Sequence, residues 1–139
     1  MIAPALTCRI DEWVNRWIGA RHAYDGRTDA GIDCYGLVVR FYAEIYGIEL
    51  PDWTADALRS GQWEAERQRR WLALDLPVDP CIAIVRRRAT LPSHVGIYWR
   101  GRIVHAVERG GVQADTVATF IRAIGRPEYG VPLVESSRA

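Results

Sequence analysis

The sequence predicts one α+β domain over residues 1–139, with N-terminal helices packed on an antiparallel β-sheet. Three observations predict this class. The length suits a single domain with a core of its own. From about residue 8 to 74, apolar side chains recur at three- and four-residue steps, as on one face of a helix. From about residue 76 to 134, they form short β-branched and aromatic runs between turns, which is typical of strands.

The first helix is predicted from an apolar face that starts after Thr7, a candidate N-cap, and stops at Gly19. This face comprises Ile10, Trp13, Val14, Trp17 and Ile18. Residues 20–31 are rich in glycine and aspartate and are expected to form an irregular loop. His22 and Tyr24 lie in this loop, and His22 is interpreted as a solvated side chain.

A second helix is predicted from Cys34 to about Tyr46. Asp33 is a good N-cap, because its carboxylate can accept the unpaired backbone N–H groups of the first turn. Gly47 suits a left-handed cap at the other end, and Pro51 ends the helical pattern. Residues 54–74 are again helical in character, with Gly61 dividing them, and the arginines at 67–70 are interpreted as a solvated helix face.

The remaining segments are predicted to be strands. Residues 81–85 form an apolar run suited to a strand buried on both faces, so Cys81 is expected in the core. Residues 93–99 and 102–107, separated by Arg100-Gly101, are a hairpin signal. Residues 112–124 fit either a strand with a short helix or one longer helix. Residues 129–134 are expected to close the sheet as an edge strand, because Pro132 cannot donate to a ladder.

Composition narrows the classes of function. The chain is 49% hydrophobic and 25% charged with a net charge of +1, so we expect a folded protein that binds neither nucleic acid nor a membrane surface. Three cysteines at unrelated spacings argue against a disulfide framework and favour a reducing compartment. The residues before Cys8 lack a basic region, so we expect synthesis in the cytoplasm without a signal peptide. Cys8 is interpreted as a packing residue.

Cys34 is the candidate nucleophile. At the first turn of a helix, the partial positive charge of the N-terminus favours the thiolate, which is the reactive form of cysteine. The alternative is a buried, inert thiol, because unpaired cysteine is among the most buried residue types. The position of Cys34 alone leaves both interpretations open.

Two histidines strengthen the catalytic interpretation. If Arg100-Gly101 is a two-residue turn, Gly96 faces His105, and His94 lies diagonally across from His105 on the same face. Such diagonal neighbours are about 7–8 Å apart between Cα atoms, which lets two imidazoles lean together. One histidine can then orient the other as a general base. A three-residue loop without a bulge would instead place the two on opposite faces.

These motifs resemble the NlpC/P60 cysteine peptidases: the run Asp33-Cys34-Tyr35-Gly36-Leu37-Val38, then His94-Val95-Gly96-Ile97-Tyr98, then His105. The resemblance covers roughly residues 10–134. It implies a papain-like fold and cleavage of peptidoglycan stem peptides, typically between D-glutamate and a diamino acid. We expect no metal and no cofactor, because the Cys and His spacings match no zinc pattern and only His94 and His105 are expected to lie close together.

The resemblance also implies roles for single residues. Cys34 corresponds to the nucleophile, His94 to the base, and His105 to the polar residue that holds the imidazole. Tyr24 resembles the family's upstream tyrosine at the oxyanion or substrate-positioning site, although its spacing to the cysteine is shorter than usual. Tyr35 stands where many members have serine, which with the preceding aspartate, here Asp33, helps some relatives to bind a substrate amino terminus.

The variant motif at 33–38 and the following residues 47–51 resemble the phage-type branch of the family. This likeness implies a cell-wall hydrolase carried on a virion tail, with tail-tip or hub proteins as partners. Two alternatives stay open. The domain is a structural tail-tip or hub component with incidental activity, or it is an amidase or acyltransferase on the same scaffold, since a Cys-His pair serves any acyl transfer.

Overall fold

The computed structural model describes residues 2–51, 71–86 and 94–133. Helix α1 (Pro4–Trp17) is followed by a two-stranded ribbon of β1 (Arg27–Thr28) and β2 (Gly31–Ile32). Helix α2 (Cys34–Phe41) continues into a π-helical turn, η1 (Tyr42–Tyr46). The predicted helical segment at 54–70 lies outside the described residues.

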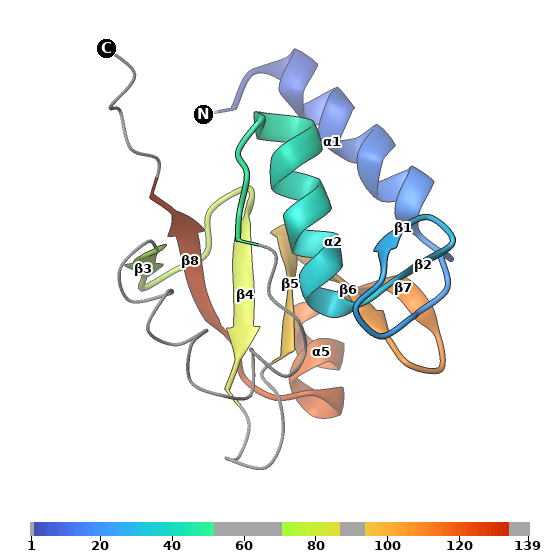
Figure 1. The fold of residues 1–139 in the computed structure, drawn as a ribbon. Helices are drawn as coiled ribbons and strands as arrows, with labels where there is room; N and C mark the ends of the chain where they lie inside the picture. Colours follow the sequence, from blue (N-terminus) through green and yellow to red (C-terminus); the bar gives the residue numbers. More distant parts are fainter. Residues whose placement is uncertain (1, 52–70, 87–93, 134–139) are drawn as a thin grey trace.

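The described strands of the second half form a six-stranded antiparallel sheet with the order β3-β8-β4-β5-β6-β7. The strands are β3 (Trp71–Leu74), β4 (Cys81–Val85), β5 (His94–Trp99), β6 (Arg102–Val107), β7 (Gly111–Thr116) and β8 (Glu128–Pro132). A short helix, α5 (Val117–Ala123), joins β7 to β8. Helix α2 lies over the middle of the sheet, with α1 beside it (Figure 1).

Three predicted elements are confirmed. Helix α2 begins after Asp33 and its π-helical extension ends at Gly47, whose φ of 67° is left-handed. Strand β4 is buried on both faces, with Cys81 fully inside. Strands β5 and β6 form the expected hairpin, in which Trp99 pairs with Arg102. Arg100 (φ 53°) and Gly101 (φ 83°) both have positive φ, as a two-residue type I′ turn requires.

Three predictions about the helical half are wrong in detail. Helix α1 begins at Pro4, so Thr7 is not its N-cap but donates from within the helix to the carbonyl of Ala3. Residues 71–74 form strand β3 instead of ending a helix, because they pair with β8. The loop at 20–31 contains the short β1–β2 ribbon. Strand β3 and the β1–β2 ribbon both form by pairing with another strand. The local periodicity of apolar residues does not predict such pairing.

The last strand, β8, is not at the edge of the sheet. It lies between β3 and β4, and it pairs with both. Pro132 is tolerated there because it is the final residue of β8, beyond Gly130, the last of its residues to pair with β4. The ambiguous segment at 112–124 is a strand followed by a short helix.

The two faces of the sheet carry different cores. On β4, Ile82 and Ile84 join the main cluster under α1 and α2, whereas Ala83 and Val85 join a smaller cluster with Phe120 of α5. Each fully buried isoleucine, valine or phenylalanine side chain contributes about 1.5–3 kcal/mol. The sheet is therefore covered by α2 on one face and by α5 on the other.

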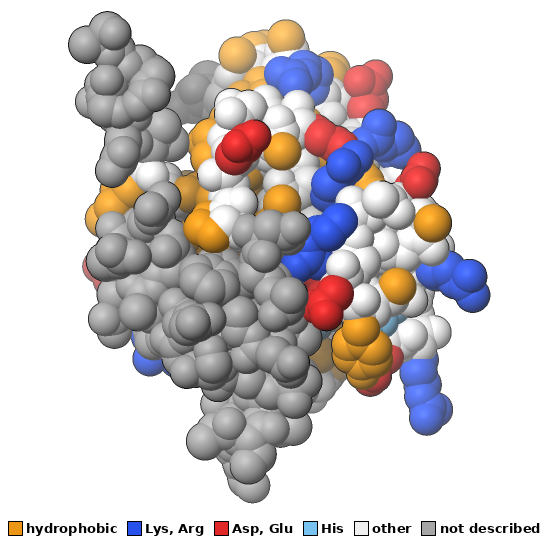
Figure 2. Space-filling view, viewed as in Figure 1, with side chains coloured by type: hydrophobic (Ala, Val, Ile, Leu, Met, Phe, Trp, Pro, Cys, Tyr) orange, Lys and Arg blue, Asp and Glu red, His pale blue; other side chains and the backbone are white. Residues whose placement is uncertain are grey.

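The visible surface mixes charges of both signs. Figure 2 shows basic and acidic side chains interspersed on one face, without a large area of a single sign among the described residues. Among the described residues, no helix is long and apolar enough to cross a membrane.

Candidate active site

Cys34 is the first residue of α2, and the residue before it sets that start. The Asp33 side chain accepts a hydrogen bond from the backbone N–H of Gly36 at 2.7 Å, which confirms the predicted N-cap. Cys34 is half-buried and packs against the main core. Cys81 is fully buried, and burial raises the pKa of its thiol to about 11. Cys8 is exposed, so its interpretation as a packing residue is wrong.

The Asp33 carboxylate is a structural anchor beneath Cys34. It is only 6% exposed, and both oxygens are engaged by the chain itself. One oxygen accepts from Arg27 at 2.8 Å as well as from Gly36, and the other accepts the backbone N–H of Asp25 at 2.9 Å. Asp33 therefore positions Cys34 by joining the preceding loop to the first turn of α2.

The two histidines meet as the hairpin register predicts. His94 Nε2 lies 2.9 Å from His105 Nδ1, and the rings are edge-to-face with an interplanar angle of 88°. Gly96 keeps the space beside them open. A Cβ at this position would lie 3.0 Å from His105 Cβ and 2.8 Å from the carbonyl oxygen of Val104.

His105 has a second partner that the sequence analysis missed. Its Nε2 is hydrogen bonded to Asp115 Oδ2 at 2.7 Å, and Gln113 Nε2 donates to the same oxygen at 2.8 Å. The register of β6 and β7 places Gln113 opposite His105, so Asp115 is a diagonal neighbour. The same diagonal rule that pairs His94 with His105 would have found Asp115, had residues 112–116 been assigned to a strand.

Burial and hydrogen bonding set the protonation of this pair. His105 is 1% exposed, and burial lowers its pKa although Asp115 opposes the shift. Burial alone would raise the pKa of Asp115, but hydrogen bonds from His105 and Gln113 outweigh it and hold that pKa below its usual value. The arrangement therefore favours a neutral His105 beside an ionised Asp115.

Phe120 of α5 packs against both imidazoles. Its ring centroid lies 4.9 Å from that of His105 and 6.0 Å from that of His94. The ring of Phe120 is tilted by 77° to that of His105 and by 34° to that of His94.

Tyr24 lies in the loop between α1 and β1. Its side chain is 69% exposed, its hydroxyl donates to the carboxylate of Glu108, and its ring packs edge-on against His22. Glu108 follows the end of β6, the strand that carries His105. The loop of Tyr24 is tied to β7, because Val112 exchanges two backbone hydrogen bonds of 2.9 Å with Gly19 and Ala20.

The cysteine and histidine elements meet at one end of the sheet. Helix α2 packs on β5 and β6. His94 is the first residue of β5 and pairs with Val85 at the end of β4. Figure 1 shows α2 beginning at the end of the sheet where the β4 arrow points, and Cys34 is the first residue of α2. A thiol, two imidazoles and a carboxylate are thus contributed by α2, β5, β6 and β7.

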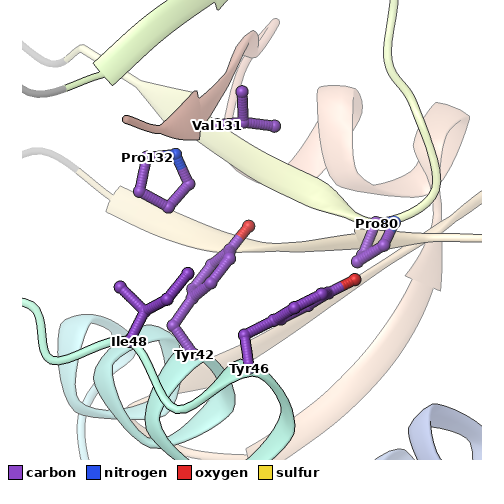
Figure 3. Close-up of a pocket in the computed structure, with 6 residues that line it drawn as sticks. All are labelled: Tyr42, Tyr46, Ile48, Pro80, Val131 and Pro132. Atoms are coloured by element: carbon purple, nitrogen blue, oxygen red, sulfur yellow. The ribbon is translucent and has the colours of Figure 1, made fainter. Parts of the chain in front are cut away.

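A separate pocket lies at the opposite end of the α2–η1 helix. It has a volume of about 210 Å³ and is lined by Tyr42, Tyr46, Ile48, Pro80, Val131 and Pro132 (Figure 3). These residues supply neither a thiol nor an imidazole, so the pocket is not a second nucleophilic site. Among the described residues, no group of three or more His, Cys, Asp and Glu is placed to hold a metal ion.

Comparison with known proteins identifies the family of this chain. The sequence model of the NlpC/P60 family matches residues 19–122. The chain belongs to the NlpC/P60 family. The crystal structure of the NlpC/p60 domain of the peptidoglycan hydrolase SagA matches with a TM-score of 0.62 at 19% identity, covering 90% of this chain and 97% of that one. The predicted family and its α+β, papain-like fold are therefore confirmed.

Two relatives show how far the sequence similarity extends. The murein DD-endopeptidase MepS/murein LD-carboxypeptidase of Escherichia coli K12 is 32% identical over 105 residues, which are 75% of this chain and 51% of that protein. The probable endopeptidase NlpC homolog of Haemophilus influenzae is 40% identical over 48 residues, 34% of this chain and 26% of that protein. The chain spans about half the length of the first relative, and the match to the second covers about a quarter of that protein.

Proposed function

We propose that this NlpC/P60 domain is a cysteine peptidase that hydrolyses peptidoglycan stem peptides. The observation that carries the proposal is the histidine pair, with 2.9 Å between ring nitrogens, on the two strands against which the capped helix that begins with Cys34 packs. Family membership and a relative named as a murein endopeptidase support the substrate class.

In the proposed reaction His94 takes the proton of the Cys34 thiol, and the sulfur attacks the amide carbon of the stem peptide. The oxyanion accepts from the Cys34 backbone N–H, one of the first-turn amides that a helix cannot pair internally. The C–N bond then breaks, and protonated His94 donates to the leaving amine. Water attacks the thioester and His94 takes its proton, which releases a carboxylate and restores Cys34. His105 holds the imidazole of His94 throughout.

The proposed scissile bond joins D-glutamate, through its γ-carboxyl group, to the diamino acid. Sacculi and defined muropeptides are digested with wild type and with Cys34→Ala, and the products are identified by mass spectrometry. We expect a new amino terminus on the diamino acid in the wild type only. Release of the sugar from L-alanine would instead identify an amidase.

A second cysteine variant controls for the loss of a thiol. Cys8 is exposed and remote from the histidines in the chain, so Cys8→Ala is expected to keep full activity. Cys34→Ala is expected to abolish product formation while leaving the circular dichroism spectrum and the melting temperature nearly unchanged. Residual cleavage by Cys34→Ala would contradict the nucleophile assignment.

We further propose that the domain is synthesised in the cytoplasm and acts at the cell wall as part of a phage tail or gene-transfer particle. The support is the resemblance of residues 33–38 and 47–51 to the phage-type branch. Mass spectrometry of purified particles is expected to detect the protein, and its absence from them would contradict the proposal. Particles that assemble with Cys34→Ala but no longer open the wall would separate an enzymatic role from a structural hub role.

A further inference from the structure

We propose that Asp115 is a positioning residue that fixes which nitrogen of His94 acts as the base. The inference rests on the proposed function for its catalytic meaning, but not for its geometry. Asp115, His105 and His94 lie on three adjacent strands, β7, β6 and β5, and each is hydrogen bonded to the next.

The direction of these hydrogen bonds follows from Asp115, because its carboxylate can only accept. An ionised carboxylate has no proton to donate, so His105 Nε2 must donate to Asp115 Oδ2. Gln113 donates to the same oxygen, which fixes the carboxylate in place as an acceptor. A carboxylate that is already held by an amide donor loses little further entropy when it receives the imidazole.

The proton position on His105 then decides the proton position on His94. A neutral imidazole carries one N–H, so a His105 protonated at Nε2 presents a lone pair at Nδ1. His94 Nε2, 2.9 Å away, must therefore donate its proton to this lone pair. The proton of neutral His94 is thus held at Nε2, and Nδ1 is left as the unprotonated nitrogen that can take a proton from Cys34.

Without Asp115 the chain of hydrogen bonds is expected to reverse. His105 is 1% exposed, so an Nε2–H without an acceptor would be a buried, unsatisfied donor. His105 avoids that cost by moving its proton to Nδ1 and donating to His94 Nε2. His94 then carries its proton on Nδ1, and it has no lone pair to offer the thiol.

The groups that face His105 come from three neighbouring elements. From α5 the facing group is the uncharged ring of Phe120, which touches both imidazoles. From β7 it is Gln113 beside Asp115, and from β5 it is His94. Asp115 is the ionised carboxylate among these groups. It therefore determines that His94 donates to His105 and that His105 donates to Asp115.

Two substitutions of Asp115 distinguish the effect of its hydrogen-bond acceptor from the effect of its negative charge. Asp115→Leu has nearly the same shape but no acceptor, whereas Asp115→Asn keeps a carbonyl oxygen that can still accept from His105 and Gln113. Histidine ring ¹⁵N chemical shifts at about pH 8, above the ordinary histidine pKa, report which nitrogen carries the proton. We expect Nε2–H at both histidines in the wild type and in Asp115→Asn, and Nδ1–H at both in Asp115→Leu.

Kinetics with defined muropeptides supply the second readout. Asp115→Leu is expected to lower kcat on the order of 100-fold with KM within about twofold, because a mis-set base affects only the transition state. Asp115→Asn is expected to recover most of this loss. Chloroacetamide alkylation of Cys34 at neutral pH, measured in a Cys8→Ala background, is expected to slow in parallel with kcat.

The inference is overturned if Asp115→Leu keeps Nε2–H at both rings, or if its tautomers change while kcat stays at the wild-type value. An equal loss of kcat in Asp115→Asn and Asp115→Leu would also overturn it, because the negative charge of Asp115 and not its acceptor oxygen would then be required. The NMR readout needs no substrate, so failure of the proposed peptidase activity and failure of this inference give different results.

Discussion

Arg27 Nη1 lies 2.8 Å from Asp33 Oδ1, and this ion pair joins the β1–β2 ribbon to the first turn of α2. Both side chains are largely buried, with 19% and 9% of their surface exposed. The pair therefore holds the loop of Tyr24 and the helix of Cys34 in one rigid arrangement. Breaking it is expected to affect the position of the thiol as well as stability.

Asp33→Ala is expected to lower the free energy of unfolding by about 2 kcal/mol, because it removes an N-cap and the largely buried ion pair between Asp33 and Arg27. Asp33→Asn keeps the capping oxygen and should lose about half as much. Urea denaturation measures both. Asp29→Ala, an exposed aspartate in the same loop, is the matched control and should be nearly neutral. Equal losses for Asp29→Ala and Asp33→Ala would contradict the anchoring role.

Gly96→Ala is expected to damage the site by steric contact. The new Cβ would lie 2.8 Å from the carbonyl oxygen of Val104 and 3.0 Å from His105 Cβ, so the strand or the imidazole must shift. We expect a loss of about 1–3 kcal/mol in stability and a drop in kcat on the order of 10-fold or more. Urea denaturation and muropeptide kinetics measure the two effects.

The control for this substitution is another glycine of the same hairpin. At Gly101, no heavy atom lies within 4 Å of the position that a Cβ would occupy, and its φ of 83° is a conformation that asparagine tolerates. Gly101→Asn should therefore leave kcat unchanged. Wild-type activity in Gly96→Ala would show that the space beside His105 is not needed.

The histidine pair could be predicted because its causes are local. A two-residue turn with Gly101 fixes the register of the hairpin, and the register alone places His94 diagonal to His105. The start of α2 was equally local, because Asp33 caps the helix with its own side chain. Both depend on residues no more than eleven positions apart in the sequence.

The missed features depend on partners far away in the sequence. Trp71–Leu74 contains good helix formers and becomes a strand only because β8, which follows much later in the chain, pairs with it. Asp115 escaped detection because residues 112–124 fit two patterns, and the strand assignment follows from pairing with β6. The ion pair of Arg27 with Asp33 could not be predicted from the sequence, because it depends on the fold of the loop that brings the two residues together.

The buried histidine predicts a pH dependence of stability. Burial lowers the pKa of His105 in the folded state, so the unfolded chain binds more protons near and below its ordinary value of about 6.5. Stability should therefore fall as the pH drops below about 6.5. The groups that face His105 are Asp115 from β7, His94 from β5 and the uncharged Phe120 from α5. Of these, Asp115, whose folded pKa is also lowered, adds a further loss only below about pH 4.

His105→Gln tests this dependence. Urea midpoints are measured for wild type and variant at about pH 7 and about pH 5, on either side of the ordinary histidine pKa. The variant should show a smaller decrease between the two values, and His22→Gln, in the loop of Tyr24, serves as the control. An unchanged decrease in His105→Gln would assign the dependence to other groups.

Tyr24 offers a test of chemistry without a change in stability. Its side chain is 69% exposed, so Tyr24→Phe should leave the free energy of unfolding within about 0.5 kcal/mol of wild type. If its hydroxyl serves the oxyanion or positions the substrate, kcat/KM should fall on the order of 10-fold. Tyr46→Phe, at the far end of the α2–η1 helix, is the control and should not change kcat/KM. The hydroxyl donates its single proton to Glu108, so it must leave this acceptor before it can donate to an oxyanion. Glu108→Gln, a weaker acceptor, should therefore raise kcat/KM or leave it unchanged, and a fall as large as that of Tyr24→Phe would show that the two residues act as one unit.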